Sequence, residues 1–261
     1  MRYYRGHEQS CDPRRVKTST PTTATPPTAT AVRRALRQFA SPERAIGVAR
    51  FFKTGKGEYG EGDVFIGCSV PEQRIVARQF RALSIAAADE LLTSKIHEER
   101  ATALLILVAR FNASPDEAVR KKIHRLYLKR LPYINNWDLV DSSAEYLVGG
   151  WLADKDRGVL DRFARSKHLW TRRVAMLATF HFIKAGSADD ALRIAALLLD
   201  DRHDLIHKAV GWMLREVGKR VSLTPLRAFL KRHAATMPRT ALRYAIERLP
   251  AAERAKWMAI R

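Results

Sequence analysis

The chain has 261 residues, with 47 Lys and Arg against 27 Asp and Glu, so its formal net charge is +20. Such a charge favours polyanionic partners, above all nucleic acid, with binding that weakens as salt concentration rises. Two cysteines exclude a disulfide framework, no apolar run approaches the ~20 residues needed to span a bilayer, and the polar, basic first residues do not form a secretory signal. We therefore expect a globular cytoplasmic protein that does not enter a membrane.

The sequence shows no metal-binding pattern. Cys11 and Cys68 lie far apart, and the eight His residues are scattered, with no HExxH motif and no Cys/His cluster. We therefore expect neither a metal ion nor an organic cofactor.

Residues 1–30 are expected to form a disordered tail. Residues 18–30 read TSTPTTATPPTAT, a Thr/Pro-rich composition with almost nothing to bury. The simplest interpretation is a dispensable extension, or a start codon assigned too early, with a functional arm as the alternative. The rest of the chain, 31–261, is expected to be a single domain.

From residue 31 onward the pattern predicts one helix after another. Ser41 with Pro42 marks a helix start, and Pro71 and Ser114 repeat that signal. Helices are expected at about 31–39 and 42–54, and a third begins at 71. The others are expected at about 97–112, 116–130, 136–153, 168–185, 188–200, 203–219, 224–235 and 238–248. Apolar residues recur at three- and four-residue spacing, and no strand alternation appears. Paired helices with short connections favour an all-α fold, a stacked α-solenoid, over a four-helix bundle.

The segment 55–60 spells GxGxxG but does not have the setting of a nucleotide site. A dinucleotide fingerprint follows a strand and opens a helix, whereas this segment follows a helix and the next helix begins only near Pro71. A kinase-type loop would need downstream VAIK and HRD motifs, which the chain lacks. We interpret 55–62 as a flexible connection between helices that closes against a ligand or only joins them.

Residues 135–141 (NNWDLVD) are the most informative of the chain. Trp137 and Asp141 are four residues apart, so on a helix they share one face. Asp138 fits the favourable interaction of a carboxylate with a helix N-terminus, and Asn135 or Asn136 can cap that end. Asp141 lies beyond the first turn, so the helix dipole explains it less well. An acid beside an aromatic surface in a basic protein suggests that a positive charge is stabilised there.

Two later segments repeat the combination of Trp with a charged neighbour. Trp170 and Arg173 are at positions i and i+3, and Lys208, Trp212 and Arg215 fall on one stripe of a helix. A single Trp is more often a core residue than a ligand contact. In a solenoid, however, the same face of successive repeats lines one concave surface, so we expect these side chains to lie along it.

Several segments of the sequence, taken together, resemble the AlkD-type DNA alkylation repair glycosylases, which are all-helical proteins built from HEAT-like repeats. The resemblance covers about residues 31–250. It rests on Pro42-Glu43 with Ala49-Arg50-Phe51-Phe52-Lys53, Gly67 with Pro71-Glu72 and Arg74, Trp137-Asp138 with Val140-Asp141, Trp170 with Arg173, and Lys208-Ala209-Val210-Gly211-Trp212 with Leu214-Arg215-Glu216.

The resemblance implies a monofunctional enzyme that hydrolyses the N-glycosidic bond of 3-methyladenine and 7-methylguanine in duplex DNA. It implies that Asp141 is the catalytic carboxylate, that Trp137 and Trp212 flank the damaged nucleotide, and that Arg173 contacts a backbone phosphate. Trp170, Lys208, Arg215 and Phe51 are further candidates for DNA contact. The implied partner is duplex DNA with alkylated bases, bound by a monomer on an open concave surface rather than in a base-flipping pocket.

The chain departs from the family pattern at three places. Phe51 stands where Tyr is common, Ser69-Val70 replaces a Gln-Thr pair, and the segment 54–66 is longer and richer in Gly. These changes concern DNA engagement rather than the carboxylate. They leave two alternatives open, a non-catalytic HEAT-like protein that binds damaged or branched DNA and a solenoid that binds proteins.

Overall fold

The computed structural model describes residues 26–260 and is all-helical over that range. Its α-helices are α1 Ala29–Arg37, α2 Pro42–Phe51, α3 Val70–Gln79, α4 Ile85–Leu92, α5 His97–Ala113, α6 Glu117–Lys129, α7 Trp137–Asp141, α8 Val159–Ala164, α9 Leu169–Ala178, α10 Phe180–Lys184, α11 Asp189–Leu197, α12 Asp204–Arg220, α13 Leu223–His233, α14 Arg239–Ala245 and α15 Ala251–Ala259. A 3-10 turn, η2 (Leu131–Tyr133), and a π-helical turn, η3 (Glu145–Gly149), complete them.

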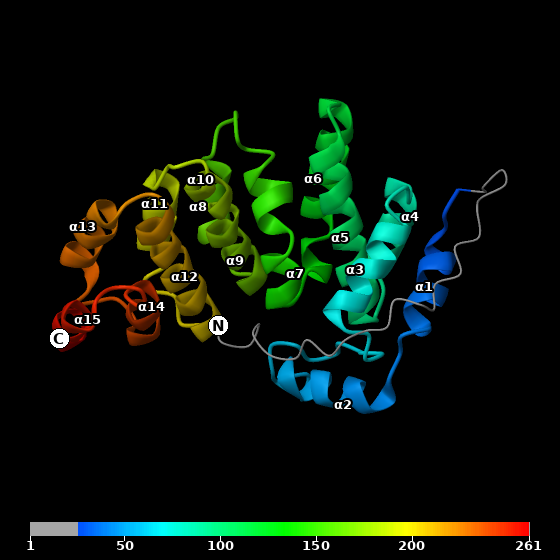
Figure 1. The fold of residues 1–261 in the computed structure, drawn as a ribbon, viewed down its shortest axis with the longest axis horizontal. Helices are drawn as coiled ribbons and strands as arrows, with labels where there is room; N and C mark the ends of the chain where they lie inside the picture. Colours follow the sequence, from blue (N-terminus) through cyan, green and yellow to red (C-terminus); the bar gives the residue numbers. More distant parts are fainter. Residues whose placement is uncertain (1–25, 261) are drawn as a thin grey trace.

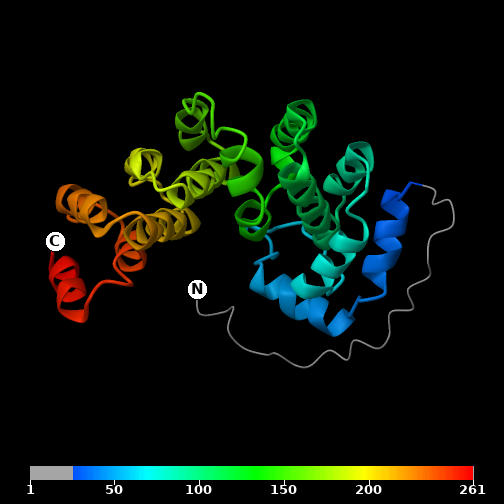
Figure 2. The ribbon, with the colours of Figure 1, turned by 45° about the horizontal axis from the view of Figure 1, so that its top comes forward.

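The helices follow one another in a curved row from α1 to α15 (Figures 1 and 2). Each packs mainly against neighbours close to it along the chain, with α4 on α5, α8 on α9 and α12 on α14. This is the α-solenoid expected from the sequence, in which successive helices cover one another's apolar faces. α9 lies in the middle of the row and is almost wholly buried. None of the helices described is long and apolar enough to cross a bilayer.

The first helix begins earlier than expected. α1 starts at Ala29, and the Thr28 hydroxyl caps it by accepting a hydrogen bond from the Ala31 amide at 3.2 Å. Ala29 is 2% exposed, so the last residues of the expected tail belong to the folded chain. Residues 1–25 of that tail lie outside the described residues.

Several helices differ from the sequence expectation. The helices α4, α8 and α15 were not predicted. The expected helix over 136–153 divides into α7 and η3, and that over 168–185 divides into α9 and α10.

Hydroxyl side chains explain both breaks. The Ser143 hydroxyl donates to the Leu139 carbonyl at 2.5 Å, and the Thr179 hydroxyl donates to the Met176 carbonyl at 2.6 Å. Each bond competes with the helical ladder for a carbonyl oxygen and so favours a change of helical geometry. At Gly149, a Cβ atom would lie 2.3 Å from the Ala178 carbonyl oxygen, so only glycine permits this close approach of η3 to α9.

The segment after α2 is anchored by one buried carboxylate. Glu98, on α5, is 1% exposed and accepts backbone hydrogen bonds from Ile66, Gly67 and Cys68 at 2.8–3.3 Å. A parallel bridge joins Val64 to Ile96 just before it. The GxGxxG segment therefore leads from α2 into a fixed, non-helical segment, without the strand-to-helix setting of a dinucleotide site.

Gly67 allows a comparison that separates backbone strain from steric clash. Its φ is +78°, the same as that of Gly57, but a Cβ atom on Gly67 would lie 2.1 Å from the Ser41 carbonyl oxygen, whereas one on Gly57 meets nothing within 4 Å. We expect Gly57→Ala to lower the free energy of unfolding by about 1–2 kcal/mol, the cost of the left-handed conformation alone. Gly67→Ala should cost clearly more, as measured by urea unfolding. Equal losses would show that the segment moves away from α2 without cost.

Candidate nucleic-acid site

Asp141, at the C-terminal end of α7, is held by Arg173 on α9. The Arg173 guanidinium donates from Nε to Oδ1 and from Nη2 to Oδ2, both at 2.8 Å, in a bidentate pair. Its third nitrogen, Nη1, donates to the Leu205 carbonyl on α12. One planar group thus joins three helices and fixes the plane of the carboxylate.

The pair is largely removed from solvent. The Asp141 side chain is 12% exposed and that of Arg173 is 2% exposed. Burial raises the pKa of Asp141, and the neighbouring Arg173 opposes that rise by favouring the charged form. A carboxylate has about four lone-pair directions, of which Arg173 uses two. Among the described residues, no other group donates a hydrogen bond to the Asp141 carboxylate, so a partner could reach the remaining directions only through its 12% exposed part.

Arg173 and Trp170 do not lie where the sequence analysis expected them. Arg173 was expected to contact a phosphate, but it is buried and directs its donors to Asp141 and Leu205. Trp170 was expected on an open surface, but it is 4% exposed and belongs to the core. The i, i+3 spacing placed both on one helix face correctly, and that face packs against α7 and α12 rather than facing solvent.

Trp137 stands in an aromatic cluster at the start of α7. The Asn136 side chain caps this helix by accepting from the Trp137 amide at 2.8 Å. The indole stacks on Phe52, with centroids 5.0 Å apart, and meets Phe51 edge-on at 5.8 Å. Phe51 is 55% exposed. Trp137 and Phe51 therefore form an aromatic surface that is accessible at the end of α2.

The Gly-rich loop brings Tyr59 into this region. Its ring lies 5.9 Å from Trp170 and 6.5 Å from His203. Burial raises the pKa of Tyr59, while a hydrogen bond with the Trp137 side chain and the positive charge of Lys208 lower it. The loop therefore places a phenol between α7, α9 and the start of α12, a position the sequence did not reveal.

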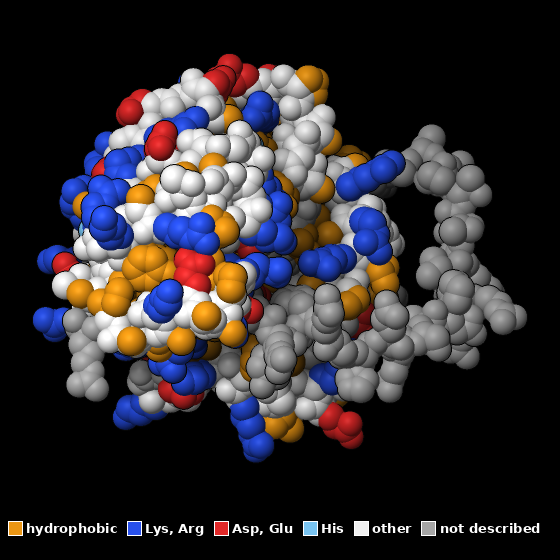
Figure 3. Space-filling model, turned by 60° about the vertical axis from the view of Figure 1, so that its left-hand side comes forward, with side chains coloured by type: hydrophobic (Ala, Val, Ile, Leu, Met, Phe, Trp, Pro, Cys, Tyr) orange, Lys and Arg blue, Asp and Glu red, His pale blue; other side chains and the backbone are white. Residues whose placement is uncertain are grey.

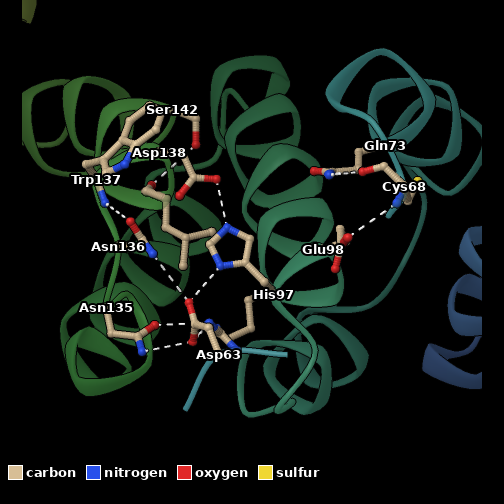
Figure 4. Close-up of polar contacts among 12 residues, drawn as sticks. Asp63, Cys68, Gln73, His97, Glu98, Asn135, Asn136, Trp137, Asp138 and Ser142 are labelled. Atoms are coloured by element: carbon tan, nitrogen blue, oxygen red, sulfur yellow. Dashed lines mark hydrogen bonds and ion pairs between the residues drawn. The ribbon is translucent and has the colours of Figure 1, made fainter. Parts of the chain in front are cut away.

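A buried charged network supports α7 from the other side (Figure 4). His97, the first residue of α5, is 2% exposed. Its Nε2 lies 2.8 Å from Asp138 Oδ2 and its Nδ1 lies 2.9 Å from Asp63 Oδ2. Burial by itself lowers the pKa of His97, but Asp138 and Asp63 outweigh it and raise that pKa to about 9. His97 is therefore an imidazolium at neutral pH, bonded to a carboxylate on each side.

Asp63 is the most connected member of the network. Arg100 donates to its Oδ1 at 2.6 Å, and Asn135 and Asn136 donate at 3.2 and 3.4 Å. Burial raises the pKa of Asp63, but His97 and Arg100 outweigh that effect and lower it to about 2. Asp63, His97 and Arg100 were not predicted as site residues, because they lie in separate segments without a recognisable spacing. Asp138 was expected to interact with the helix dipole alone.

The C-terminal candidates differ in accessibility. Trp212 is partly buried beside Phe180, with centroids 6.0 Å apart. The Lys208 side chain is 39% exposed and forms an ion pair with Asp204 at 2.6 Å. Arg215 is only 11% exposed and pairs with Glu247 and with Glu216. Of the three, Lys208 is the most accessible for a phosphate, whereas Arg215 is occupied within the fold.

Basic side chains are spread over the surface around the C-terminal helices. On the face towards the C-terminal helices, Lys and Arg outnumber Asp and Glu (Figure 3). Together with the net charge of +20, this distribution attracts polyanions without selecting one sequence.

The elevated pKa of His97 makes the stability of the protein depend on pH. The pKa rises from its ordinary 6.5 to about 9 on folding, so the ion pairs stabilise fully below pH 6.5 and lose their effect as pH rises through 9. At about 1.4 kcal/mol per pH unit, this loss is on the order of 3 kcal/mol. Urea unfolding between pH 6 and 9.5 should show this decline in the wild type and a flatter profile in His97→Gln. Parallel profiles would mean that His97 does not titrate in this range.

The comparisons with known proteins agree with this architecture. A family model described as DNA alkylation repair enzyme matches residues 32–249. Among solved structures, one described as a predicted DNA alkylation repair enzyme from Enterococcus faecalis has a TM-score of 0.63 at 18% identity, covering 81% of this chain and 97% of that one. At that identity the likeness shows the fold alone. No curated protein sequence matches the chain. The match of the family model over most of the described helices shows that the chain belongs to the DNA alkylation repair enzyme family.

Proposed function

We propose that the protein is a monofunctional DNA glycosylase that removes cationic alkylpurines, 3-methyladenine and 7-methylguanine, from duplex DNA, acting as a monomer. The observation that supports it most is the Asp141 carboxylate, fixed by two 2.8 Å bonds from Arg173 at the end of the helix that begins with Trp137. Membership of a DNA alkylation repair family and the charge of +20 supply the context.

The chemistry needs little beyond a placed negative charge. An alkylated purine is already a cationic leaving group, so its departure requires no strong general acid. As the glycosidic bond breaks, positive charge develops on the sugar, and a nearby carboxylate stabilises that charge and orients the attacking water. Asp141 would serve both purposes through the lone pairs that Arg173 leaves free.

The aromatic surface would bind the charged nucleotide. Indole and phenyl faces attract cations by about 0.5–2 kcal/mol each. Trp137 and the exposed Phe51 are adjacent, at 5.8 Å, and Phe51 belongs to the helix that ends just before the Gly-rich loop. Lys208, accessible on α12, would contact a phosphate, and Trp212 would line the same strand of DNA further along the row.

The role of Arg173 changes under this proposal. A side chain that is 2% exposed is poorly placed for a phosphate, so we assign Arg173 to positioning. It opposes the effect of burial on the pKa of Asp141 and holds the plane of the carboxylate relative to Trp137.

One observation favours a second candidate, a non-catalytic protein that binds damaged or branched DNA. Asp141 is 12% exposed, and both of its oxygens accept bonds from Arg173, which also describes a purely structural ion pair. That candidate predicts salt-sensitive DNA binding with no release of base, and binding that is unaffected by substitution of Asp141.

Asp141→Asn distinguishes the two candidates. We expect this variant to fold and to bind DNA as the wild type does, but to lose most of the rate of 7-methylguanine release from methylated duplex DNA, on the order of 100-fold. Both proteins are assayed at one fixed salt concentration. Asp89→Asn is the matched control, because Asp89 forms a similar bidentate pair with Arg130, at 2.5 and 2.9 Å, away from Trp137. Release that survives in a folded Asp141→Asn variant would remove Asp141 from the mechanism.

Arg173→Met tests the positioning role through pH. Removing the cation that opposes burial raises the pKa of Asp141 further, so the acidic limb of the excision rate should move to higher pH. Leaving the carboxylate buried and unpaired should also lower the free energy of unfolding by about 3–5 kcal/mol. Arg173→Lys keeps the charge and should shift the limb less. A limb at unchanged pH in Arg173→Met would show that Asp141 does not control it.

A further inference from the structure

We propose that His97 is a positioning residue for Trp137 and Asp141, acting through Asp138 and through the aromatic cluster. The proposal deepens the proposed function and rests on it, since it concerns the geometry of the same site. It concerns a side chain that touches neither Trp137 nor Asp141 but holds the helix that carries both.

The helix α7 cannot hold its own orientation. It consists of five residues, little more than one turn, and an isolated helix of that length is unstable in water. Trp137 opens it and Asp141 ends it, so both candidate residues depend on contacts from outside the helix. Arg173 supplies one of these at the C-terminal end.

His97 supplies the contact at the other end. Asp138, next to Trp137, is bonded through Oδ2 to His97 Nε2 at 2.8 Å, and its Oδ1 is buried without a hydrogen-bond partner. The opposite nitrogen of the ring bonds to Asp63 at 2.9 Å (Figure 4). Asp63 is fixed in turn by Arg100, which donates to its other oxygen at 2.6 Å. The imidazole is therefore fixed on both sides. Through its bond to Asp138 Oδ2, it restricts the orientation of α7.

The same ring also supports the indole of Trp137. His97 stacks on Phe65 with centroids 4.5 Å apart and lies 5.1 Å from Phe52. Phe52 stacks on Trp137 at 5.0 Å with an interplanar angle of 16°. A continuous column of rings thus leads from His97 to Trp137, so the histidine constrains both the backbone and the side chain at the start of α7.

The network stabilises the fold while His97 is protonated, but stability alone does not require charged groups at this place. Burying charged groups carries a desolvation penalty that a well-packed apolar cluster avoids, so an apolar cluster could stabilise the same contact as well. A charged network fixes the orientation of its side chains, because each hydrogen bond requires a defined distance and angle. Asp63 belongs to the segment that follows the Gly-rich loop, so the network also fixes that loop, with Tyr59, against α7.

His97→Gln tests the proposal, with His124→Gln as the matched control. His124 is also buried, bonds to the Leu147 carbonyl at 2.8 Å and stacks on Trp151, so neither its hydrogen bond nor its ring pair involves a residue of α7. We expect His97→Gln to slow single-turnover release of 7-methylguanine about 10- to 100-fold, with the Kd for unmodified duplex DNA changed less than about twofold. His124→Gln should keep the wild-type rate, even where both variants lose similar thermal stability.

A second measurement does not depend on activity. Hydrogen exchange of backbone amides in residues 135–145 should be faster in His97→Gln than in the wild type, and unchanged in His124→Gln. Asp138→Asn, which keeps the size of the side chain and removes its charge, should move rate and exchange in the same direction and takes the place of His97→Gln if that variant does not fold.

The outcomes separate the two proposals. Release by His97→Gln at the wild-type rate, or equal slowing in both histidine variants, would overturn the positioning role. If the wild type releases no base, the proposed glycosylase fails, and the exchange measurement alone decides. Faster exchange confined to His97→Gln would then support the positioning role in a DNA-binding protein, and unchanged exchange would overturn it.

Discussion

The buried pair of Asp141 and Arg173 is the interaction on which the candidate site depends. A single guanidinium connects α7, α9 and α12, since it bonds both oxygens of Asp141 and the carbonyl of Leu205. Three donors in one plane leave little rotational freedom, so the relative placement of these helices is set with the orientation of the carboxylate. Burial raises the pKa of Asp141, and the same guanidinium opposes that rise.

A site on a solenoid needs such constraints more than a site within a closed cavity does. Helices in a curved row contact mainly their neighbours, so small changes in packing alter the spacing of residues that lie several helices apart. In this protein, hydrogen bonds between charged side chains hold the short helix α7 at both ends. Arg173 holds Asp141 at its end, and His97 with Asp63 holds Asp138 near its start. α7 is short, yet both of its ends are fixed.

The same constraints explain the position of the Gly-rich loop. It contains a pattern associated with phosphate binding but lacks the strand and helix that such a site requires. Its end is anchored instead, by Glu98 through three backbone amides and by Asp63 within the charged network. The anchored loop carries Tyr59 to the neighbourhood of Trp137 and Trp170. This segment thus adds an aromatic group to the candidate site.

The sequence by itself determined the all-helical fold, because helical periodicity and caps are local properties of the chain, and its motifs resembled those of the family that the family model confirms. The Trp137/Asp141 spacing predicted a site at α7, which stays a prediction. Only the tertiary structure decided which way each helix face points. Trp170 and Arg173 share a face as predicted, but that face is buried against α7 and α12. The network of Asp63, His97 and Asp138 was likewise invisible, since it joins segments 34 and 41 residues apart. Burial and long-range pairing are set by how helices pack, and no local pattern encodes them.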